Sequence, residues 1–482
     1  MSALWTSGDA ADATGGRNTQ DWQATGVSID TRELNPGDLF VALKDVRDGH
    51  DFVAKALAQG ASAALVSRIP EGVTEDAPLL IVKDVLQALN ALGVAGRTRA
   101  KAKVIAVTGS VGKTSTKEML RAVLNRQGRT HAAERSFNNH WGVPLTLARL
   151  PQDADFAVIE IGMSHPGEIA PLARLTKPHI AMITTIAPAH LEAFENLAGI
   201  ALEKAAIFEG LEPRGTAIIN GDLDTSPILI EAARAAGAEI NTFGETADDV
   251  HRLTSVNLSR NTTVCQAQIG DIPVLFKLST PGRHFATNAV GVLGVVAALN
   301  ADLALAANDL TLWQPPQGRG TVETLLLDAA EPRMSIDLID DAFNANPTSM
   351  SAALEVLAAT EPVDNIGRIG RGRRIAVLGD MLELGPDEMA RHTEIANLPA
   401  TQAIDVIHCA GPRMRMLYDI LPEDQRGLWT MTAAELATKA HTLIDAGDVL
   451  LVKGSKGSKV SLVVDAIRKL GHPRPTETEE TV

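Results

Sequence analysis

A short glycine-containing segment carries the clearest chemical signal in this sequence. Residues 108–116 read Thr-Gly-Ser-Val-Gly-Lys-Thr-Ser-Thr, directly after the apolar run 104–107 and before an amphipathic stretch. Glycines permit a tight turn whose backbone N–H groups face phosphate oxygens, and a following helix adds the positive end of its dipole. Lys113 can reach the terminal phosphates and the Thr114 hydroxyl can bind Mg²⁺. The segment therefore predicts a phosphate-binding loop for ATP or GTP.

This loop is a contracted form of the usual motif. Val107 stands where the usual motif has its first glycine, so the pattern reduces to Gly109-x-x-Gly112-Lys113-Thr114. We expect the phosphates to contact Gly109, Ser110, Val111, Gly112, Lys113, Thr114 and Ser115.

Three further residues are candidates for work on a bound phosphate. Glu160 ends the apolar run 156–161, and a carboxylate at the C-terminal end of a strand near such a loop is placed to hold Mg²⁺. His190 follows another apolar run and could bind a metal ion or cap local structure. Lys204 has apolar neighbours in a helix-like segment, where lysine usually extends to water. Each of the three alone also fits an ordinary structural role.

The elements that must position these residues follow from hydrophobic periodicity. From residue 104 onward, apolar strand candidates alternate with helical patterns, which predicts βαβ units and a mostly parallel sheet with helices on both faces. Residues 251–278 are more polar and strand-like and predict an antiparallel addition to it. The pattern begins again at residue 336, which predicts a separate doubly wound, Rossmann-like domain. Residues 1–100 read as a small α/β domain.

A chain of 482 residues exceeds what one core usually supports, and about three domains are expected. The alternating strand and helix patterns predict a fold of the α/β class. Two linker-like stretches, 96–103 and 313–320, place the domains at 1–100, 101–316 and 317–482. The Gly-rich run 368–374 carries four arginines, which favours a solvated surface loop over an anion-binding patch.

Composition excludes several classes of function. The 44 Lys and Arg against 59 Asp and Glu give a net charge of −15, which disfavours a nucleic-acid partner. Cys265 and Cys409 lack metal-like spacing and predict buried structural thiols. The N-terminus does not resemble a signal peptide, and no apolar run approaches the roughly 18 residues of a membrane span. We expect a cytoplasmic protein without membrane insertion.

Taken together, the chemical residues resemble those of the ATP-dependent Mur ligases of peptidoglycan synthesis. The shared set is the contracted loop, Glu160, His190, Lys204 and the motif Pro281-Gly282-x-His284-x-x-x-Asn288-Ala289. The motifs at 30–32, 36–43 and 48–50 look like the UDP-binding domain of the members that add the third and fourth amino-acid units. Those at 136–146, 340–347 and 377–385 are similar to the branch that adds D-alanyl-D-alanine.

The resemblance implies a role for each matching residue. Lys113 would neutralise the β and γ phosphates, Thr114 and Glu160 would hold one Mg²⁺, and His190 would hold a second with Lys204, carrying a CO₂-derived carbamate. ATP would also contact Asn288, Arg319, Asp341 and Asn344. The UDP-substrate would contact Asp30, Thr31, Arg32, Asn138 and Asn139.

The resemblance also implies the reaction. The chain is expected to be a monomeric, ATP-dependent ligase that joins D-alanyl-D-alanine to UDP-N-acetylmuramoyl-tripeptide through an acyl phosphate, releasing ADP and phosphate. Two local departures are Phe343, where the family motif usually has Tyr, and Phe194-Glu195-Asn196, where it often has Phe-Gly-Ser.

Two alternatives remain open. The ligase that adds the third residue performs the same chemistry, but its usual Asp-Asn-Pro-Arg signature is absent from this sequence. A P-loop switch or partitioning ATPase would bind partners without making bonds. The guanine-reading Asn-Lys-x-Asp motif is absent, and such switches need no second metal site.

Overall fold

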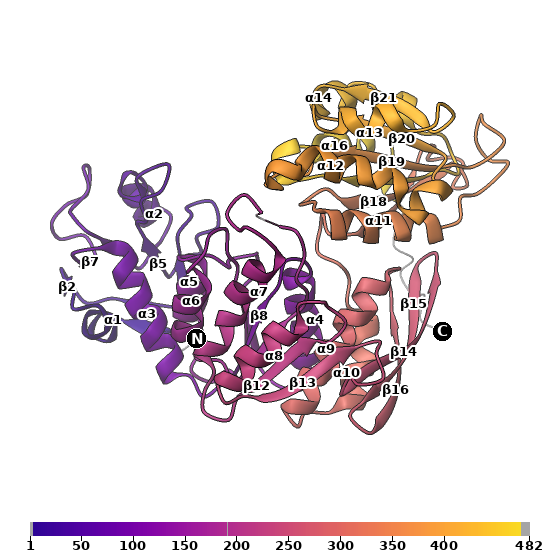
Figure 1. Ribbon diagram of the computed structural model, residues 1–482. Coiled ribbons are helices and arrows are strands. Elements are labelled where there is room, and N and C mark those ends of the chain that lie inside the picture. Colours follow the sequence, from indigo (N-terminus) through magenta and orange to yellow (C-terminus); the bar gives the residue numbers. More distant parts are fainter. Residues whose placement is uncertain (1–2, 190, 474–482) are drawn as a thin grey trace, which may run out of the picture.

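The computed structural model describes residues 3–189 and 191–473, which form three α/β domains along the chain (Figure 1). The N-terminal domain is built on a five-stranded sheet of order β2-β7-β6-β5-β4, parallel except for the β2–β7 pair. Its strands are β2 (Arg17–Asn18), β4 (Gly26–Ser28), β5 (Asp38–Val41), β6 (Ala63–Val66) and β7 (Leu79–Ile81). A small antiparallel pair and three helices complete it: β1 (Trp5–Thr6), β3 (Gln23–Ala24), α1 (Ser7–Thr14), α2 (Val53–Ala58) and α3 (Val85–Arg99).

The central domain contains a nine-stranded sheet of order β16-β15-β14-β13-β12-β11-β8-β10-β9. The pairs from β9 to β14 are parallel, and β14, β15 and β16 pair antiparallel. The strands are β8 (Lys103–Thr108), β9 (Thr130–Ala132), β10 (Phe156–Glu160), β11 (Ile180–Ile183), β12 (Thr216–Asn220), β13 (Glu239–Gly244), β14 (His251–Ser259), β15 (Thr262–Ile269) and β16 (Ile272–Leu278). The mostly parallel sheet and its antiparallel addition are both as the sequence predicted.

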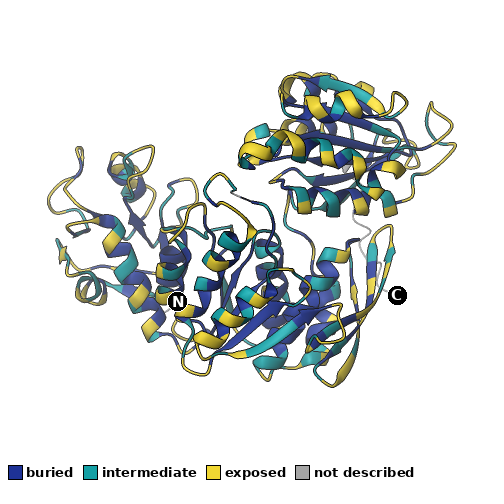
Figure 2. Cartoon of the chain, viewed as in Figure 1, coloured by how far each residue is buried: buried dark blue, intermediate teal, exposed yellow. Residues whose placement is uncertain are grey.

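Helices cover both faces of this sheet, which explains why its inner strands read as continuous apolar runs. Ile105 and Val107 face one core, formed with α4, α9 and α10, while Val104 and Ala106 face the other, formed with α5 to α8. Strands appear buried in Figure 2 and the outer helix faces exposed. The helices are α4 (Lys113–Asn125), α5 (Gly142–Ala148), α6 (Ile169–Thr176), α7 (Leu197–Ala205), α8 (Ser226–Ala235), α9 (Arg283–Ala298) and α10 (Leu303–Asp309).

The C-terminal domain contains a seven-stranded sheet of order β21-β20-β19-β22-β18-β17-β23, parallel from β21 to β18. Helices pack on both of its faces, which confirms the predicted doubly wound fold. Its strands are β17 (Thr321–Leu326), β18 (Ser335–Asp341), β19 (Arg374–Gly379), β20 (Val406–Ala410), β21 (Arg426–Thr430), β22 (Val449–Lys453) and β23 (His472–Pro473). Its helices are α11 (Pro347–Ala359), α12 (Glu388–Thr393), α13 (Met414–Ile420), α14 (Ala433–Ala437), α15 (Ala440–Leu443) and α16 (Ser461–Arg468).

The arginine-rich run 368–374 is a surface loop that ends at the first residue of β19, and its positive charge is largely matched. Ion pairs join Arg368 to Asp445, Arg371 to Asp405 and Arg373 to Asp448, and the Arg374 guanidinium donates to the Thr360 carbonyl. This pairing agrees with the surface-loop interpretation and leaves little free charge for an anion.

Both cysteines are buried, as predicted, and burial raises the pKa of the Cys265 thiol to about 12.

Within the described ranges, every helix is too short or too polar to cross a membrane.

A buried histidine makes stability depend on pH. The Nδ1 atom of His408, in β20, accepts a hydrogen bond from the Leu428 N–H at 2.8 Å. Burial, aided by the charge of Arg373, lowers the pKa of His408 from 6.5 to about 4. The unfolded chain therefore binds the proton first, and stability present above pH 6.5 is lost as the pH falls toward 4.

The side-chain oxygen of the variant His408→Asn can accept the same hydrogen bond but does not take up a proton in this pH range. We expect this variant to lose about 3 kcal/mol less of its free energy of unfolding than wild type when the pH is lowered. Urea unfolding at about pH 7 and about pH 4.5 measures the difference. The control is His165→Asn, at an exposed position. If the free energy of unfolding changed with pH equally in wild type and His408→Asn, His408 would not be a source of the pH dependence.

Candidate active site

The phosphate-binding loop lies where the central sheet changes direction. β8 has β10 on one side and β11 on the other, although the chain visits β9 and β10 before β11. Ligands of open α/β sheets bind in the crevice beyond the carboxyl ends of strands at such a switch point. The loop follows β8, Glu160 ends β10, and Thr184 follows β11, so all three meet at this crevice.

Two glycines are required because neighbouring side chains approach the loop closely. Gly109 has φ +152°, and a Cβ there would lie 2.0 Å from the Thr184 Oγ1. Gly112 has φ +86°, and its Cβ would lie 2.8 Å from the Asn288 Nδ2. The contracted loop is held by hydrogen bonds to the segment after β11: the Ser110 N–H donates to the Thr185 carbonyl at 2.8 Å, and the Thr184 hydroxyl to the Val111 carbonyl at 2.5 Å.

A buried carboxylate stands beside the first turn of α4. Glu160 is 2% exposed, and the Thr114 hydroxyl lies 3.1 and 3.0 Å from its two oxygens. The Asn138 Nδ2 donates to the Glu160 Oε1 at 2.7 Å, and the Ser136 hydroxyl lies 2.9 Å from that of Thr114. These hydroxyl and carboxylate oxygens are of the kind that bind Mg²⁺.

Two lysines bring positive charge to this region: Lys113 is half-buried and Lys204 is buried. The Lys113 Nζ donates to the Gly109 carbonyl at 2.7 Å. Burial lowers the pKa of Lys113, the Glu160 charge opposes the shift, and Arg319 adds to it. Lys204 on α7 is only 2% exposed, so it does not extend to water as a lone lysine usually does. Burial, together with the positive charge of Lys113, holds the pKa of Lys204 well below its usual range, although Glu203 opposes the shift.

The C-terminal domain presents a second set of charged groups to the same space. The Arg319 Nη2 donates to the Ser136 hydroxyl at 3.0 Å, and its guanidinium lies 4.1 Å from the centre of the Phe343 ring. Phe343 thus supplies an aromatic face but no hydroxyl. Burial raises the pKa of Asp341, and the Lys453 ammonium, 2.7 Å from its Oδ2, opposes the shift.

Lys453 was missed by the sequence analysis. It lies at the end of β22, is 1% exposed, and also donates to the Asn344 carbonyl at 3.0 Å. Burial, with the Lys453 charge, lowers the pKa of His284 to about 4. The signal available in the sequence was a lysine at the C-terminal end of a parallel strand, where ligand-binding residues of such domains collect.

A cavity of about 930 Å³ between the central and C-terminal domains unites most of the predicted ATP residues. The predicted residues that line it are Ser110, Val111, Gly112, Lys113, Thr114, Ser115, Asn138, Asn139, Glu160, Asn288, Arg319, Asp341 and Asn344. The predicted residues Gly109 and Lys204 do not line it. The Gly109 carbonyl accepts from the Lys113 Nζ, and Lys204 is buried on α7, where the Lys113 charge acts on it. The predicted metal ligand His190 lies outside the described residues. Among the described ones, no three His, Cys, Asp or Glu side chains converge as a metal cluster.

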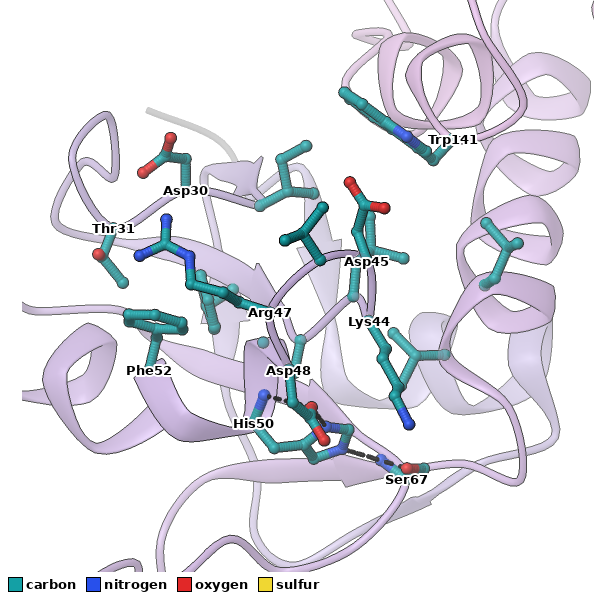
Figure 3. Close-up of a pocket in the computed structure, with 18 of the residues that line it drawn as sticks. Asp30, Thr31, Lys44, Asp45, Arg47, Asp48, His50, Phe52, Ser67 and Trp141 are labelled. Carbon is teal, nitrogen blue, oxygen red and sulfur yellow. Dashed lines mark hydrogen bonds and ion pairs between the residues drawn. The ribbon is translucent and has the colours of Figure 1, made fainter.

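The N-terminal domain has its own cavity, of about 730 Å³ (Figure 3). Asp30, Thr31 and Arg32 line it as predicted. Five further basic residues, which the sequence analysis did not single out, also line it: Lys44, Arg47, Lys55, Arg68 and Lys83. Lys55 lies on α2 and the other four lie in loops, so no spacing in the sequence revealed the cluster.

His50 organises one wall of this cavity. Its Nε2 accepts from the Ser67 N–H at 2.9 Å, so the other ring nitrogen carries the proton and contacts Asp48 at 2.7 Å. Figure 3 shows both contacts, with Trp141 on the far side of the cavity from Phe52. His50 belongs to the 48–50 motif, which supported the family resemblance.

The predicted UDP-substrate set is divided between the two cavities. Asn138 and Asn139 line the interdomain cavity, because their loop runs past the end of β10 rather than over the N-terminal sheet. His140, the next residue, lines both cavities. The two cavities therefore adjoin at this loop.

This combination of fold and site is that of a known family of ligases. Family models match residues 107–296 as the Mur ligase middle domain, 330–456 as the Mur ligase, glutamate ligase domain, and 23–97 as the Mur ligase family, catalytic domain. The chain belongs to the Mur ligase family, as its motifs predicted.

Its relatives include two enzymes named UDP-N-acetylmuramoyl-tripeptide–D-alanyl-D-alanine ligase. The one from Rickettsia prowazekii (strain Madrid E) is 32% identical over 463 residues, covering 96% of this chain and 99% of that protein. The one from Escherichia coli (strain K12) is 37% identical over 451 residues, covering 92% and 94%. A crystal structure of MurF from Acinetobacter baumannii matches with a TM-score of 0.81 at 30% identity, covering 96% of this chain and 99% of that one.

The glycine at the start of the loop provides a test of the site. We expect Gly109→Ala to weaken binding of Mg²⁺-ATP by at least about tenfold, because the new Cβ must displace the Thr184 hydroxyl and the loop with it. Isothermal titration calorimetry measures the change. Gly370→Ala is the matched control, since nothing lies within 4 Å of its Cβ. Equal affinities for Gly109→Ala and wild type would place the phosphates elsewhere.

Proposed function

We propose that this chain is the ATP-dependent ligase that joins D-alanyl-D-alanine to UDP-N-acetylmuramoyl-tripeptide in peptidoglycan precursor synthesis. The proposal rests on one observation: two cavities adjoin at His140. One is the basic cavity of the N-terminal domain, and the other contains the phosphate loop. The substrates named for relatives that are more than 30% identical over nearly the whole chain support this choice.

The reaction requires activation of a carboxylate. A free carboxylate is a poor acyl donor because its leaving group would be oxide, so the γ-phosphoryl group of ATP is first transferred to it. The resulting acyl phosphate is attacked by the amine of D-alanyl-D-alanine. A tetrahedral intermediate forms and phosphate leaves, so that the products are the new peptide bond, ADP and phosphate.

Lys113 and Arg319 provide positive charge where negative charge spreads over the transferring phosphoryl oxygens. Lys113 reaches the loop from α4, and Arg319 lines the same cavity from its C-terminal side, where it donates to Ser136. Both are fixed by hydrogen bonds before substrate arrives, so little reorganisation is needed during the reaction.

Mg²⁺ fits the oxygen donors of Thr114 and Glu160, and we propose these two residues as its ligands. When bound, the ion would neutralise phosphate charge and orient the γ-phosphoryl group. A second Mg²⁺ is proposed at His190 and Lys204, in keeping with the family resemblance.

Carbamylation of Lys204 would convert a cation into a metal ligand. The unprotonated amine attacks CO₂ and releases a proton, which leaves a carboxylate on nitrogen. The lowered pKa of Lys204 favours the unprotonated amine that this step requires.

The two cavities suit an elongated substrate. The N-terminal cavity, with its excess of basic side chains, would hold the diphosphate and uridine, and the peptide would extend past His140 toward the phosphate loop. Asn138 and Asn139 would then lie beneath the sugar or peptide. Closure of the C-terminal domain would bring Asp341 and Asn344 onto the nucleotide and exclude water that would hydrolyse the acyl phosphate. Since ATP and the UDP-precursor are cytoplasmic metabolites, we place the enzyme in the cytoplasm, and its monomeric state stays a prediction.

A substrate-pair assay tests the function. We expect ADP release with UDP-N-acetylmuramoyl-tripeptide and D-alanyl-D-alanine, and only background release with the corresponding UDP-dipeptide and a diamino acid. Coupled spectrophotometric detection of ADP, with mass spectrometry of the product, measures both. ADP release with the second pair alone would identify the ligase that adds the third residue. Release with neither acceptor would favour an ATPase switch.

The lysine chemistry has a separate test. We expect Lys204→Ala and Lys204→Arg to lose more than about 100-fold in kcat, because neither side chain can carry a carbamate and remain a metal ligand. Wild-type protein exchanged into ¹³C-bicarbonate should show a carbamate carbon resonance that both variants lack. Full activity of Lys204→Arg, with or without bicarbonate, would rule out the carbamate.

A further inference from the structure

Lys117 is a buried cation that lines neither cavity. It lies on α4, one turn beyond Thr114, and its side chain is 0% exposed. Its three N–H donors meet three acceptors: the carbonyls of Ala133 and Arg135, the second at 3.3 Å, and the Glu118 carboxylate at 2.8 Å. An ammonium group buried in this way is costly unless all its donors are matched.

Two of these acceptors belong to residues 133–139, which we call the bridging loop. It has no regular secondary structure and connects β9 to α5. A short turn, in which the Phe137 N–H donates to the Arg135 carbonyl at 2.8 Å, and the two hydrogen bonds from Lys117 hold the backbone at its start. Displacing the loop would leave a buried ammonium group without two of its three partners.

The bridging loop contacts all three domains. The Arg135 side chain forms an ion pair with Glu33, which follows Arg32 of the N-terminal cavity. Ser136 bonds both Thr114 and Arg319, and so touches a proposed Mg²⁺ ligand and the residue that leads into the C-terminal domain. Its neighbour Asn138 donates to Glu160 and accepts from the Gly162 N–H at 2.7 Å.

We propose that Lys117 is a positioning residue for the metal-nucleotide site and acts through the bridging loop. By holding the carbonyls of Ala133 and Arg135, it sets the places of Ser136 and Asn138, which orient the Thr114 hydroxyl and the Glu160 carboxylate. Lys117 itself touches neither nucleotide nor metal. The inference rests on the proposed binding of Mg²⁺-ATP.

The metal dependence of ATP binding distinguishes positioning from general stability. We expect Lys117→Met to weaken binding of Mg²⁺-ATP by about tenfold or more, the size of one or two lost hydrogen bonds to a charged group. Binding of ATP in EDTA should change by less than about threefold, since the phosphate loop itself is intact. Isothermal titration calorimetry measures both affinities on the full-length chain.

Hydrogen exchange followed by mass spectrometry provides a second readout. Amides of 133–139 should exchange faster in Lys117→Met, while those of α4 keep their protection. The control is Thr116→Val on the same helix, which is equally buried and whose hydroxyl has no partner within the described residues. It should retain the affinity and exchange rates of wild type.

A double variant tests whether Lys117 works through Ser136. Ser136→Ala should show the same metal-dependent loss, and Lys117→Met combined with Ser136→Ala should lose clearly less than the sum of the two. Should Lys117→Met fail to fold, Lys117→Gln, which keeps an N–H donor at shorter reach, is expected to show an intermediate loss. A folded Lys117 variant with wild-type metal dependence and wild-type exchange at 133–139 overturns the inference. A wild-type chain that does not bind Mg²⁺-ATP overturns the proposed function instead.

Discussion

The Glu160 carboxylate is buried at the carboxyl end of a central strand, and much of the site follows from the need to match its charge. A buried carboxylate is tolerated only with hydrogen-bond donors and opposite charge around it. Thr114 and Asn138 donate to it, and both Lys113 and Arg319 are close enough to interact with its charge. These partners come from the phosphate-loop helix, the loop after β9 and the linker to the C-terminal domain. One carboxylate therefore joins segments that are far apart in the sequence.

The parts of the fold that the sequence predicted are those governed by local pattern. The inner strands β8 and β10 are covered on both faces, so most of their residues are apolar and were visible as runs. The glycines at 109 and 112 were required by the positive φ angles of the loop. The buried partners were not visible. Lys117 and Lys453 look like ordinary lysines in the sequence, and only tertiary packing places carbonyls or a carboxylate around them. The hydrogen bond from Asn138 to Glu160 was not visible either, since it spans 22 residues of sequence.

Contacts between domains were also beyond prediction. Arg260, at the turn between β14 and β15, reaches Asp337 of β18 at 2.5 Å, and Asp337 is 1% exposed. Thr324 donates to the other oxygen of Asp337 at 2.8 Å. The antiparallel addition to the central sheet thus contributes to the contact between domains, because its hairpin extends to the C-terminal domain, as Figure 1 shows. The hairpin and Arg319, near the linker, give the two domains polar contacts at separate points. Polar contacts of this kind can be broken and re-formed during domain closure at a lower free-energy cost than a packed apolar interface.

Four lysines, of which Lys113 is half-buried and Lys117, Lys204 and Lys453 are buried, show how environment divides one residue type among different tasks. Lys117 and Lys453 face carbonyl and carboxylate oxygens, which stabilise an ammonium group and make each a structural anchor. Lys113 faces Glu160 and the phosphate site, where positive charge is useful in the transition state. Lys204 is buried near another cation, and that repulsion adds to burial in favouring its neutral amine. A neutral amine is a nucleophile, so the surroundings of Lys204 support its proposed reaction with CO₂, whereas the oxygens around Lys117 and Lys453 support a role in holding neighbouring segments in place.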